Sequence, residues 1–166
     1  PSIAGMDDLD HADAPQVSVG SSSTRAVWHS PELIDLHLPS GLSGYMGSGC
    51  GFAGENGDIL LPAVSLFFAV PPDTRPHLTI VPEGVRMISS DPVARVSVSE
   101  DGVESYSPCS QDQLPDSWGS ISATGSFRRA PFAAVRLHPV IVSEGNLYTA
   151  ERFSIRLDYP ESGPPS

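Results

Sequence analysis

The chain is built from short runs in which apolar and polar residues alternate, and the clearest run lies near its C-terminal end. In residues 153–159 one face carries only apolar or aromatic side chains: Phe153, Ile155, Leu157 and Tyr159. An unbroken period of two is typical of a strand that is buried on one side. Just before it, Glu144, Gly145 and Asn146 tolerate the positive φ angles of a tight turn. Residues 126–159 therefore predict strand-like runs that flank a hairpin turn.

Similar runs recur along the rest of the chain and predict further short strands. In the run 32–38, Ile34, Leu36 and Leu38 share one face. The most apolar run, residues 59–70, contains Pro62, which predicts a buried strand with a kinked start. Seven glycines between residues 41 and 57 predict a long loop or an irregular edge, and the polar residues 101–120 also predict a loop. The other expected strands are 24–28, 77–81, 84–88, 93–98, 121–124, 127–129, 132–137 and 147–159.

This pattern predicts the all-β class. No window shows the 3.6-residue period of an amphipathic helix, and 17 prolines interrupt the longer stretches. About nine or ten short strands favour an antiparallel β-sandwich or jelly-roll-like domain with long loops. We expect a mobile acidic segment at residues 1–20, one β-sandwich domain at 21–160, and a linker at 161–166. No apolar run reaches the roughly 18 residues of a membrane span.

The charge is strongly acidic and narrows the classes of partner. The chain has a formal net charge of −11, and all nine of its basic residues other than histidine are arginines. Binding to a nucleic-acid backbone requires the opposite sign, so we expect no nucleic-acid partner. An acidic surface suits an exported protein that must stay soluble or meet a basic partner. Because the chain starts without Met or a leader, we expect it to be a trimmed segment of a longer precursor.

The residues that could carry chemistry do not assemble into a recognisable site. Cys50 and Cys109 would form one disulfide in an oxidising compartment and two free thiols in the cytosol. A cysteine protease needs a thiolate beside an imidazole, and nothing near either cysteine activates it. The glycines around Cys50 lack the frames of a phosphate-binding loop and a nucleophile elbow. The acidic cluster at residues 7–13 lacks the glycine and glutamate of a calcium hand. We therefore predict no catalytic residue, metal site or cofactor.

Three blocks of sequence resemble a known family in their order and spacing. The first is GDILLP at 57–62, followed by AVP at 69–71. The second is residues 106–115, which contain QDQLP. The third combines FRR at 127–129, AAVRLHP at 133–139, Leu147 and the alternating run 153–159. Together these blocks resemble the N-terminal propeptide domain of gingipain-like cysteine endopeptidases over residues 57–159, with a weaker continuation back to residue 24.

The resemblance implies a non-catalytic domain that helps a cysteine endopeptidase to fold and keeps it latent. Such a propeptide lays a loop across the active-site cleft of the catalytic domain in the same precursor. Modest contacts suffice there, because the two domains belong to one chain. The family topology points to residues 98–115 as this loop, with Arg95 and Tyr106 as candidate contacts. It also implies a secreted bacterial protein, extracellular or at the cell surface.

This chain departs from the family pattern, and another function stays open. In arginine-specific gingipains a basic residue of the propeptide loop fills the specificity pocket, but between residues 92 and 106 this chain has only Arg95. Because Arg95 lies in an alternating run, the pattern favours an exposed strand residue over a residue that fills the specificity pocket. We expect Arg128 and Arg129 to be structural, capping strand ends. The alternative is an extracellular β-sandwich that binds glycan or protein, or a structural spacer. Its candidate stacking residues are Trp28, Tyr45, Phe52, Tyr106 and Trp118.

Overall fold

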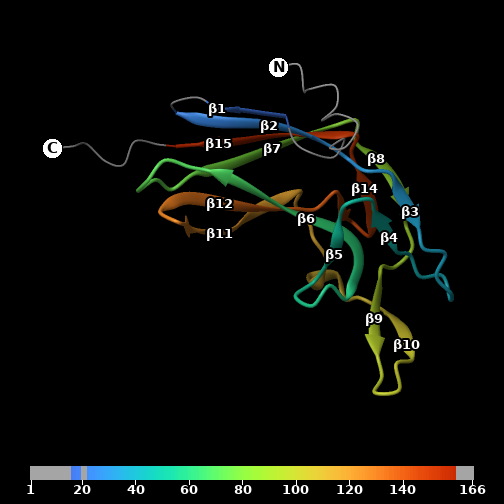
Figure 1. Cartoon of the computed structure of the whole chain (residues 1–166). Helices are drawn as coiled ribbons and strands as arrows, with labels where there is room; N and C mark the ends of the chain where they lie inside the picture. Colours follow the sequence, from blue (N-terminus) through green and yellow to red (C-terminus); the bar gives the residue numbers. More distant parts are fainter. Residues whose placement is uncertain (1–15, 20–21, 160–166) are drawn as a thin grey trace, which may run out of the picture.

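Two antiparallel sheets pack face to face, and smaller sheets extend one end of this sandwich (Figure 1). The computed structural model describes residues 16–19 and 22–159. The first sheet has the strand order β1 (Gln16–Val19), β2 (Ser23–His29), β15 (Arg152–Asp158), β7 (His77–Glu83). The second has the order β10 (Glu104–Pro108), β9 (Ala94–Val98), β6 (Ile59–Ala69), β12 (Ala130–Leu137), β11 (Gly119–Phe127), and β5 (Gly51–Ala53) also pairs with β6.

Two smaller sheets and one short helical turn complete the described chain. The third sheet has the order β13 (Val140–Ser143), β14 (Asn146–Thr149), β8 (Arg86–Ser89). The fourth pairs β3 (Leu33–Asp35) with β4 (Tyr45–Gly47). A 3₁₀ turn, η1 (Gln111–Gln113), follows β10. The described part of the chain contains no helix long and apolar enough to cross a membrane.

Aromatic and branched side chains fill the space between the first two sheets. Phe153 is fully buried at the centre, where its ring centroid lies 6.0 Å from that of Trp28 and 5.1 Å from that of Trp118. Each large side chain buried in this way stabilises the fold by about 1.5–3 kcal/mol. The first sheet also contributes Ile155 and Leu157, and the second contributes Phe68, Ala133, Val135 and Leu137.

Strand β6 bends and links this core to a second one (Figure 1). Its first five residues are all buried, and its second half then alternates between buried and exposed positions. Pro62 lies in the first part, opposite Phe52 of β5, which agrees with the predicted kinked start. The second core contains Ala53, Ile59, Leu61, Ala63, Val93, Val140, Val142 and Leu147.

The predicted class is confirmed, because all named strands pair in antiparallel sheets. The predicted turn is present: Glu144 and Gly145 have φ angles of 51° and 80° and connect β13 to β14. Phe153, Ile155 and Leu157 are buried on one face as expected. The run 147–159 is not one strand, however. It is interrupted at Ala150 and Glu151, so that β14 and β15 belong to different sheets.

Several other boundaries differ from the sequence prediction. The glycine-rich residues 41–57 contain β4 and β5, and residues 101–120 contain β10 and the start of β11. The run 32–38 forms a strand only at Leu33–Asp35, because the backbone N–H of His37 donates to Asp35 Oδ1 at 2.8 Å and closes a turn. Ile34 is consequently 48% exposed. Residues 16–19, expected in the N-terminal segment, form β1, while residues 1–15 and the linker 161–166 lie outside the described chain.

Candidate partner-binding site

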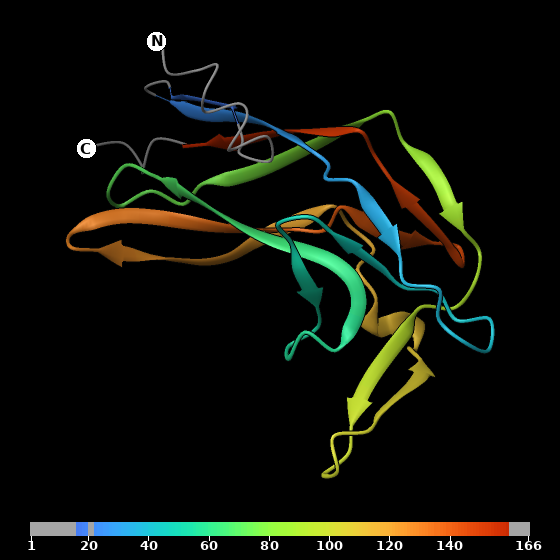
Figure 2. The same ribbon diagram turned by 45° about the vertical axis from the view of Figure 1, so that its right-hand side comes forward.

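The β9–β10 hairpin projects from the body of the molecule (Figures 1 and 2). Backbone hydrogen bonds anchor its base: the N–H of Ala94 donates to Ser43 O at 2.9 Å, and the N–H of Val96 donates to Asp58 O at 2.9 Å. Residues 97–105 are all exposed. Among the described residues, the hydrogen bonds of this outer part stay within the hairpin. The outer hairpin is therefore available to a partner.

The tip of this hairpin is acidic. Gly102, with a φ angle of 80°, allows its N–H to donate to Ser99 O at 2.9 Å and so closes the turn. Between these two residues lie Glu100 and Asp101. Two valines flank the turn, Val98 and Val103, each 62% exposed. The outer hairpin therefore offers carboxylates and small apolar groups, and residues 97–105 contain no basic side chain.

Arg95 lies at the base of the hairpin and points toward the body. Its Nε is 3.1 Å from Asp58 Oδ2, and about one third of each side chain is exposed. Since Ser107 is the cross-strand partner of Arg95 and Val96 that of Tyr106, Arg95 and Tyr106 face opposite sides of the hairpin. The region expected to be a loop, 98–115, contains β10 and η1.

Tyr106 lies on β10, next to the outer hairpin, and is tied to a neighbouring carboxylate. Its hydroxyl donates to Glu104 Oε2 at 2.8 Å. This hydrogen bond to an ionised acceptor, together with partial desolvation, raises the pKa of Tyr106. The phenol therefore stays neutral and can offer a polar edge to a partner.

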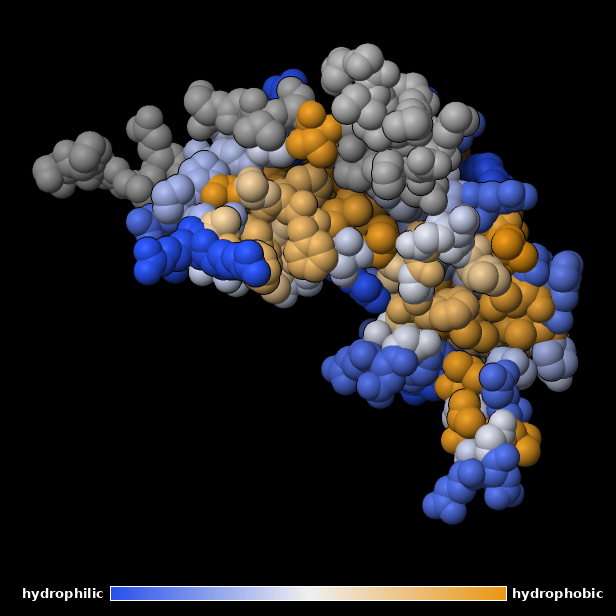
Figure 3. Space-filling view, in the orientation of Figure 1, coloured by the Kyte–Doolittle hydropathy of each residue, from blue (hydrophilic) through white to orange (hydrophobic). Residues whose placement is uncertain are grey.

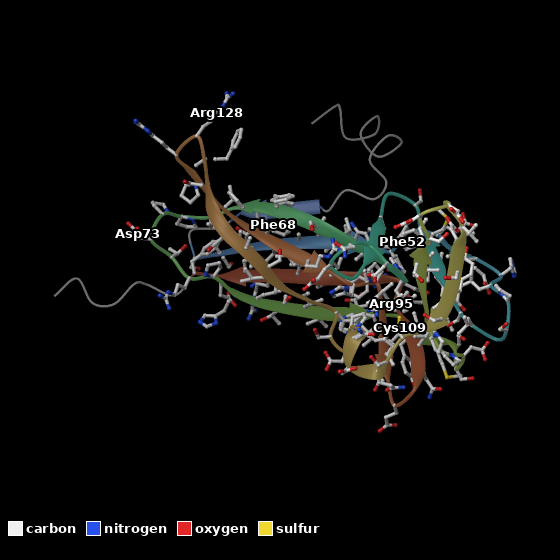
Figure 4. All side chains as sticks on the ribbon, turned by 90° about the horizontal axis from the view of Figure 1, so that it is seen from below. Phe52, Phe68, Asp73, Arg95, Cys109 and Arg128 are labelled. Carbon is white, nitrogen blue, oxygen red and sulfur yellow. The ribbon has the colours of Figure 1, made fainter. Side chains whose placement is uncertain are left out.

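The two cysteines are not joined to each other. Cys50 packs against the sandwich core and Cys109 against the second core, and the structure forms no disulfide between them. Burial raises the pKa of Cys109, which keeps it a thiol, although the neighbouring Arg95 (Figure 4) acts in the opposite direction. Within residues 16–19 and 22–159, no three His, Cys, Asp or Glu side chains lie close enough together to hold a metal ion.

The structure also contains an exposed aromatic surface that the sequence pattern did not predict. We define the aromatic face as the outward side chains Phe67 of β6, Phe127 of β11 and Phe132 of β12. Phe67 is 69% exposed and Phe127 is 68% exposed, and the rings of Phe67 and Phe132 meet edge to face with centroids 6.0 Å apart. Phe67 was not recognisable, because it lies in a run that is apolar at almost every position.

The hairpin turn between β11 and β12 ends this aromatic face. Arg128 and Arg129, which we call the arginine turn, are its two central residues, with φ angles of 50° and 68°. The guanidinium of Arg128 lies 5.4 Å from the ring centroid of Phe127. The sequence prediction of a strand at 127–129 is thus wrong for Arg128 and Arg129, which form the turn itself.

The aromatic residues proposed for glycan stacking do not form an exposed platform. Trp28 is only 2% exposed, and Trp118 packs against Phe153 in the sandwich core. The hydroxyl of Tyr45 donates to Ile88 O at 3.4 Å while its ring packs against the second core. These contacts argue against a carbohydrate site at these positions.

Comparison with known proteins supports the fold and not a sequence relationship. No protein-family profile matches the chain, and no curated protein matches it in sequence. A solved structure of the complex of the Porphyromonas gingivalis RgpB pro- and mature domains is similar, with a TM-score of 0.73 and 13% identity over 89% of this chain and 85% of that chain. A structure on the zymogenic latency of gingipain K from P. gingivalis has a TM-score of 0.59 and 16% identity, over 89% and 93%. The resemblance to gingipain propeptide domains is thereby confirmed for the fold.

Proposed function

We propose that this domain is the non-catalytic propeptide of a secreted gingipain-like cysteine endopeptidase. In this role it assists folding of the cognate catalytic domain and keeps that domain latent. The observation that carries the proposal is a fold similar to gingipain propeptide structures, combined with a hairpin that projects from the body. One of these similar structures is a complex of pro- and mature domains, and the other concerns zymogenic latency.

The β9–β10 hairpin is the part that we propose covers the active-site cleft. Strand β10 lies at the edge of its sheet, so one side of its backbone has no strand partner among the described residues. An extended segment with a free edge can pair with a second chain in the way that peptides add to a sheet edge. The hairpin is already ordered at its base, which lowers the entropic cost of binding.

The tip of the hairpin, and not Arg95, is the contact that we propose enters the cleft. Arg95 is held by Asp58 at the base, whereas Glu100 and Asp101 lie at the exposed turn. A cleft that accepts this tip must offer hydrogen-bond donors or positive charge to two carboxylates. The guarded endopeptidase therefore need not be specific for arginine.

A binding experiment tests the proposed function. The cognate catalytic domain, taken from the same precursor, is mixed with the domain, and complex formation is followed by size-exclusion chromatography with light scattering and by calorimetry. We expect a one-to-one complex, and a higher yield of active catalytic domain when it is refolded with this domain present. A folded domain that neither binds nor raises the refolding yield would contradict the proposal.

A further inference from the structure

The aromatic face and the arginine turn have no role in the core or in the β9–β10 hairpin. Phe67 and Phe127 expose more than two thirds of their area, although the neighbouring strands β6 and β12 bury their inward faces in the sandwich. Figure 3 shows apolar residues over this part of the body and a hydrophilic cluster at the end where the β11–β12 turn lies. An exposed apolar surface with a polar rim is the usual composition of a protein-binding surface.

The backbone of the arginine turn is poorly suited to its residues. A two-residue hairpin turn with two positive φ angles normally contains Asn-Gly, Asp-Gly or Gly-Gly. The β13–β14 turn of this chain is Glu144-Gly145 and keeps the glycine at its second position, whereas Arg128 and Arg129 both adopt left-handed angles without a glycine. Left-handed angles at residues with long side chains are unfavourable and concentrate at functional positions.

The arginine turn also lacks a counter-charge among the described residues. Of the nine arginines, Arg95, Arg152 and Arg156 form ion pairs with carboxylates. Arg128 and Arg129 have no carboxylate partner among the described residues, in a chain with a net charge of −11. Figure 4 shows Arg128 extending away from the body at the end opposite to Arg95 and Cys109.

The aromatic face and the hairpin are turned to the same side of the molecule. The body and the β9–β10 hairpin form the two arms of an L, and the strands β6, β11 and β12 face the inside of its angle (Figures 1, 3 and 4). Each side of a standard protein interface contributes roughly 20–30 residues. The exposed part of the hairpin, residues 97–105, supplies fewer than half of these. A partner held by the hairpin therefore requires a second contact surface.

We propose that the aromatic face and the arginine turn are this second surface and bind the catalytic domain, an inference that rests on the proposed function. The catalytic domain then supplies an apolar patch for the three phenylalanines, bordered by carboxylates for Arg128 and Arg129. Arginine binds carboxylates through two parallel N–H donors, and buried aromatic and arginine side chains dominate the affinity of many interfaces. The hairpin covers the cleft, and the aromatic face holds the two domains together.

The test replaces the arginine turn by residues that suit its backbone. R128N/R129G places Asn-Gly in the turn and removes both charges, so we expect a higher melting temperature and at least tenfold weaker binding to the catalytic domain. F67S changes an exposed ring and is expected to weaken binding by a similar factor without unfolding the domain. The matched control is R25Q/R86Q, which removes two exposed arginines elsewhere. Its affinity at 0.15 M NaCl should stay within about threefold of wild type, since exposed charges remote from an interface contribute little.

The outcomes separate this inference from the proposed function. A wild-type domain that does not bind the catalytic domain overturns both. Wild-type binding that R128N/R129G and F67S leave unchanged overturns only the second surface. A third result also overturns it: the wild-type domain forms a dimer by light scattering, R128N/R129G is a monomer, and both bind the catalytic domain equally. In that case the aromatic face joins two copies of this chain.

Discussion

His138 is a half-buried residue at the junction between β12 and β13. Its backbone N–H donates to Trp118 O at 2.8 Å, while its side-chain Nδ1 is buried without a hydrogen-bond partner among the described residues. Burial, and to a smaller extent the charge of Arg136, lowers the pKa of His138 below its ordinary value. The folded protein therefore holds this residue neutral under conditions where the unfolded chain protonates it.

We therefore predict that the free energy of unfolding decreases as the pH falls, and that the H138Q substitution removes this contribution. Because the folded pKa is depressed, the contribution of His138 is fully present above the unfolded pKa of about 6.5 and is lost as the pH falls through the folded pKa. The loss in the free energy of unfolding is at most about 1.4 kcal/mol per pH unit. Urea unfolding at pH 7.5, 6.0 and 5.0 measures it. Equal slopes for wild type, H138Q and the exposed-site control H77Q would contradict the prediction.

Truncation of two phenylalanines in neighbouring sheets should change the free energy of unfolding by very different amounts. Phe153 is fully buried between Trp28 and Trp118, so F153A should lower the free energy of unfolding by about 3–5 kcal/mol. Phe67 is 69% exposed, and F67A should change it by less than about 1 kcal/mol. Denaturant melts of both variants provide the comparison. A large loss of stability in F67A would show that the aromatic face supports the fold instead of being free to bind.

The arginine turn and the β13–β14 turn give a matched pair of elements. Each left-handed non-glycine residue costs about 1 kcal/mol, so R128N/R129G should raise the free energy of unfolding by about 1–2 kcal/mol. That corresponds to roughly 2–8 °C in melting temperature for a domain of this size. The reverse change, G145R in the β13–β14 turn, should lower the melting temperature. Differential scanning calorimetry measures both melting temperatures. A lower melting temperature for R128N/R129G than for wild type would contradict the prediction, since it would show that the arginines make favourable contacts within the domain.

Alternation in the sequence predicts a strand well when one of its faces is buried, and poorly when the strand is exposed on both faces. The run 153–159 alternates because β15 has one buried face, and the alternation alone located Phe153, Ile155 and Leu157 in the core. Strand β10 is almost entirely exposed, so no apolar period marks it, and its sequence ESYSP resembled a loop. The bend at Ala150 and Glu151 was also unmarked, because it depends on which sheets β14 and β15 join.

The candidate site was predictable only where it was local in sequence. Residues 98–115 were identified through the family resemblance, and they do contain the outer part of the projecting hairpin. That Arg95 would pair with Asp58 depends on a contact between β9 and the start of β6, which alternation cannot reveal. The arginine turn was missed because Arg-Arg is not a sequence that predicts a tight turn.

The described part of the molecule has two arms that meet at an angle. The sandwich provides a rigid arm with the aromatic face, and the hairpin provides a second arm with an acidic tip. Under the proposed function both arms belong to the same chain as the catalytic domain, so the effective concentration would be high and modest contacts would keep the cleft closed. Cleavage between the domains would remove this advantage, and dilution would then favour release.

The central claim is that the acidic hairpin tip blocks the active-site cleft, and inhibition of the cognate catalytic domain tests it most directly. Peptidase activity is measured against increasing concentrations of wild type, E100S/D101S and R95A. We expect wild type to inhibit, E100S/D101S to inhibit at least tenfold more weakly with an unchanged melting temperature, and R95A to stay within about threefold of wild type. Inhibition by E100S/D101S equal to that of wild type, or its loss in a stably folded R95A, would contradict this account of the tip.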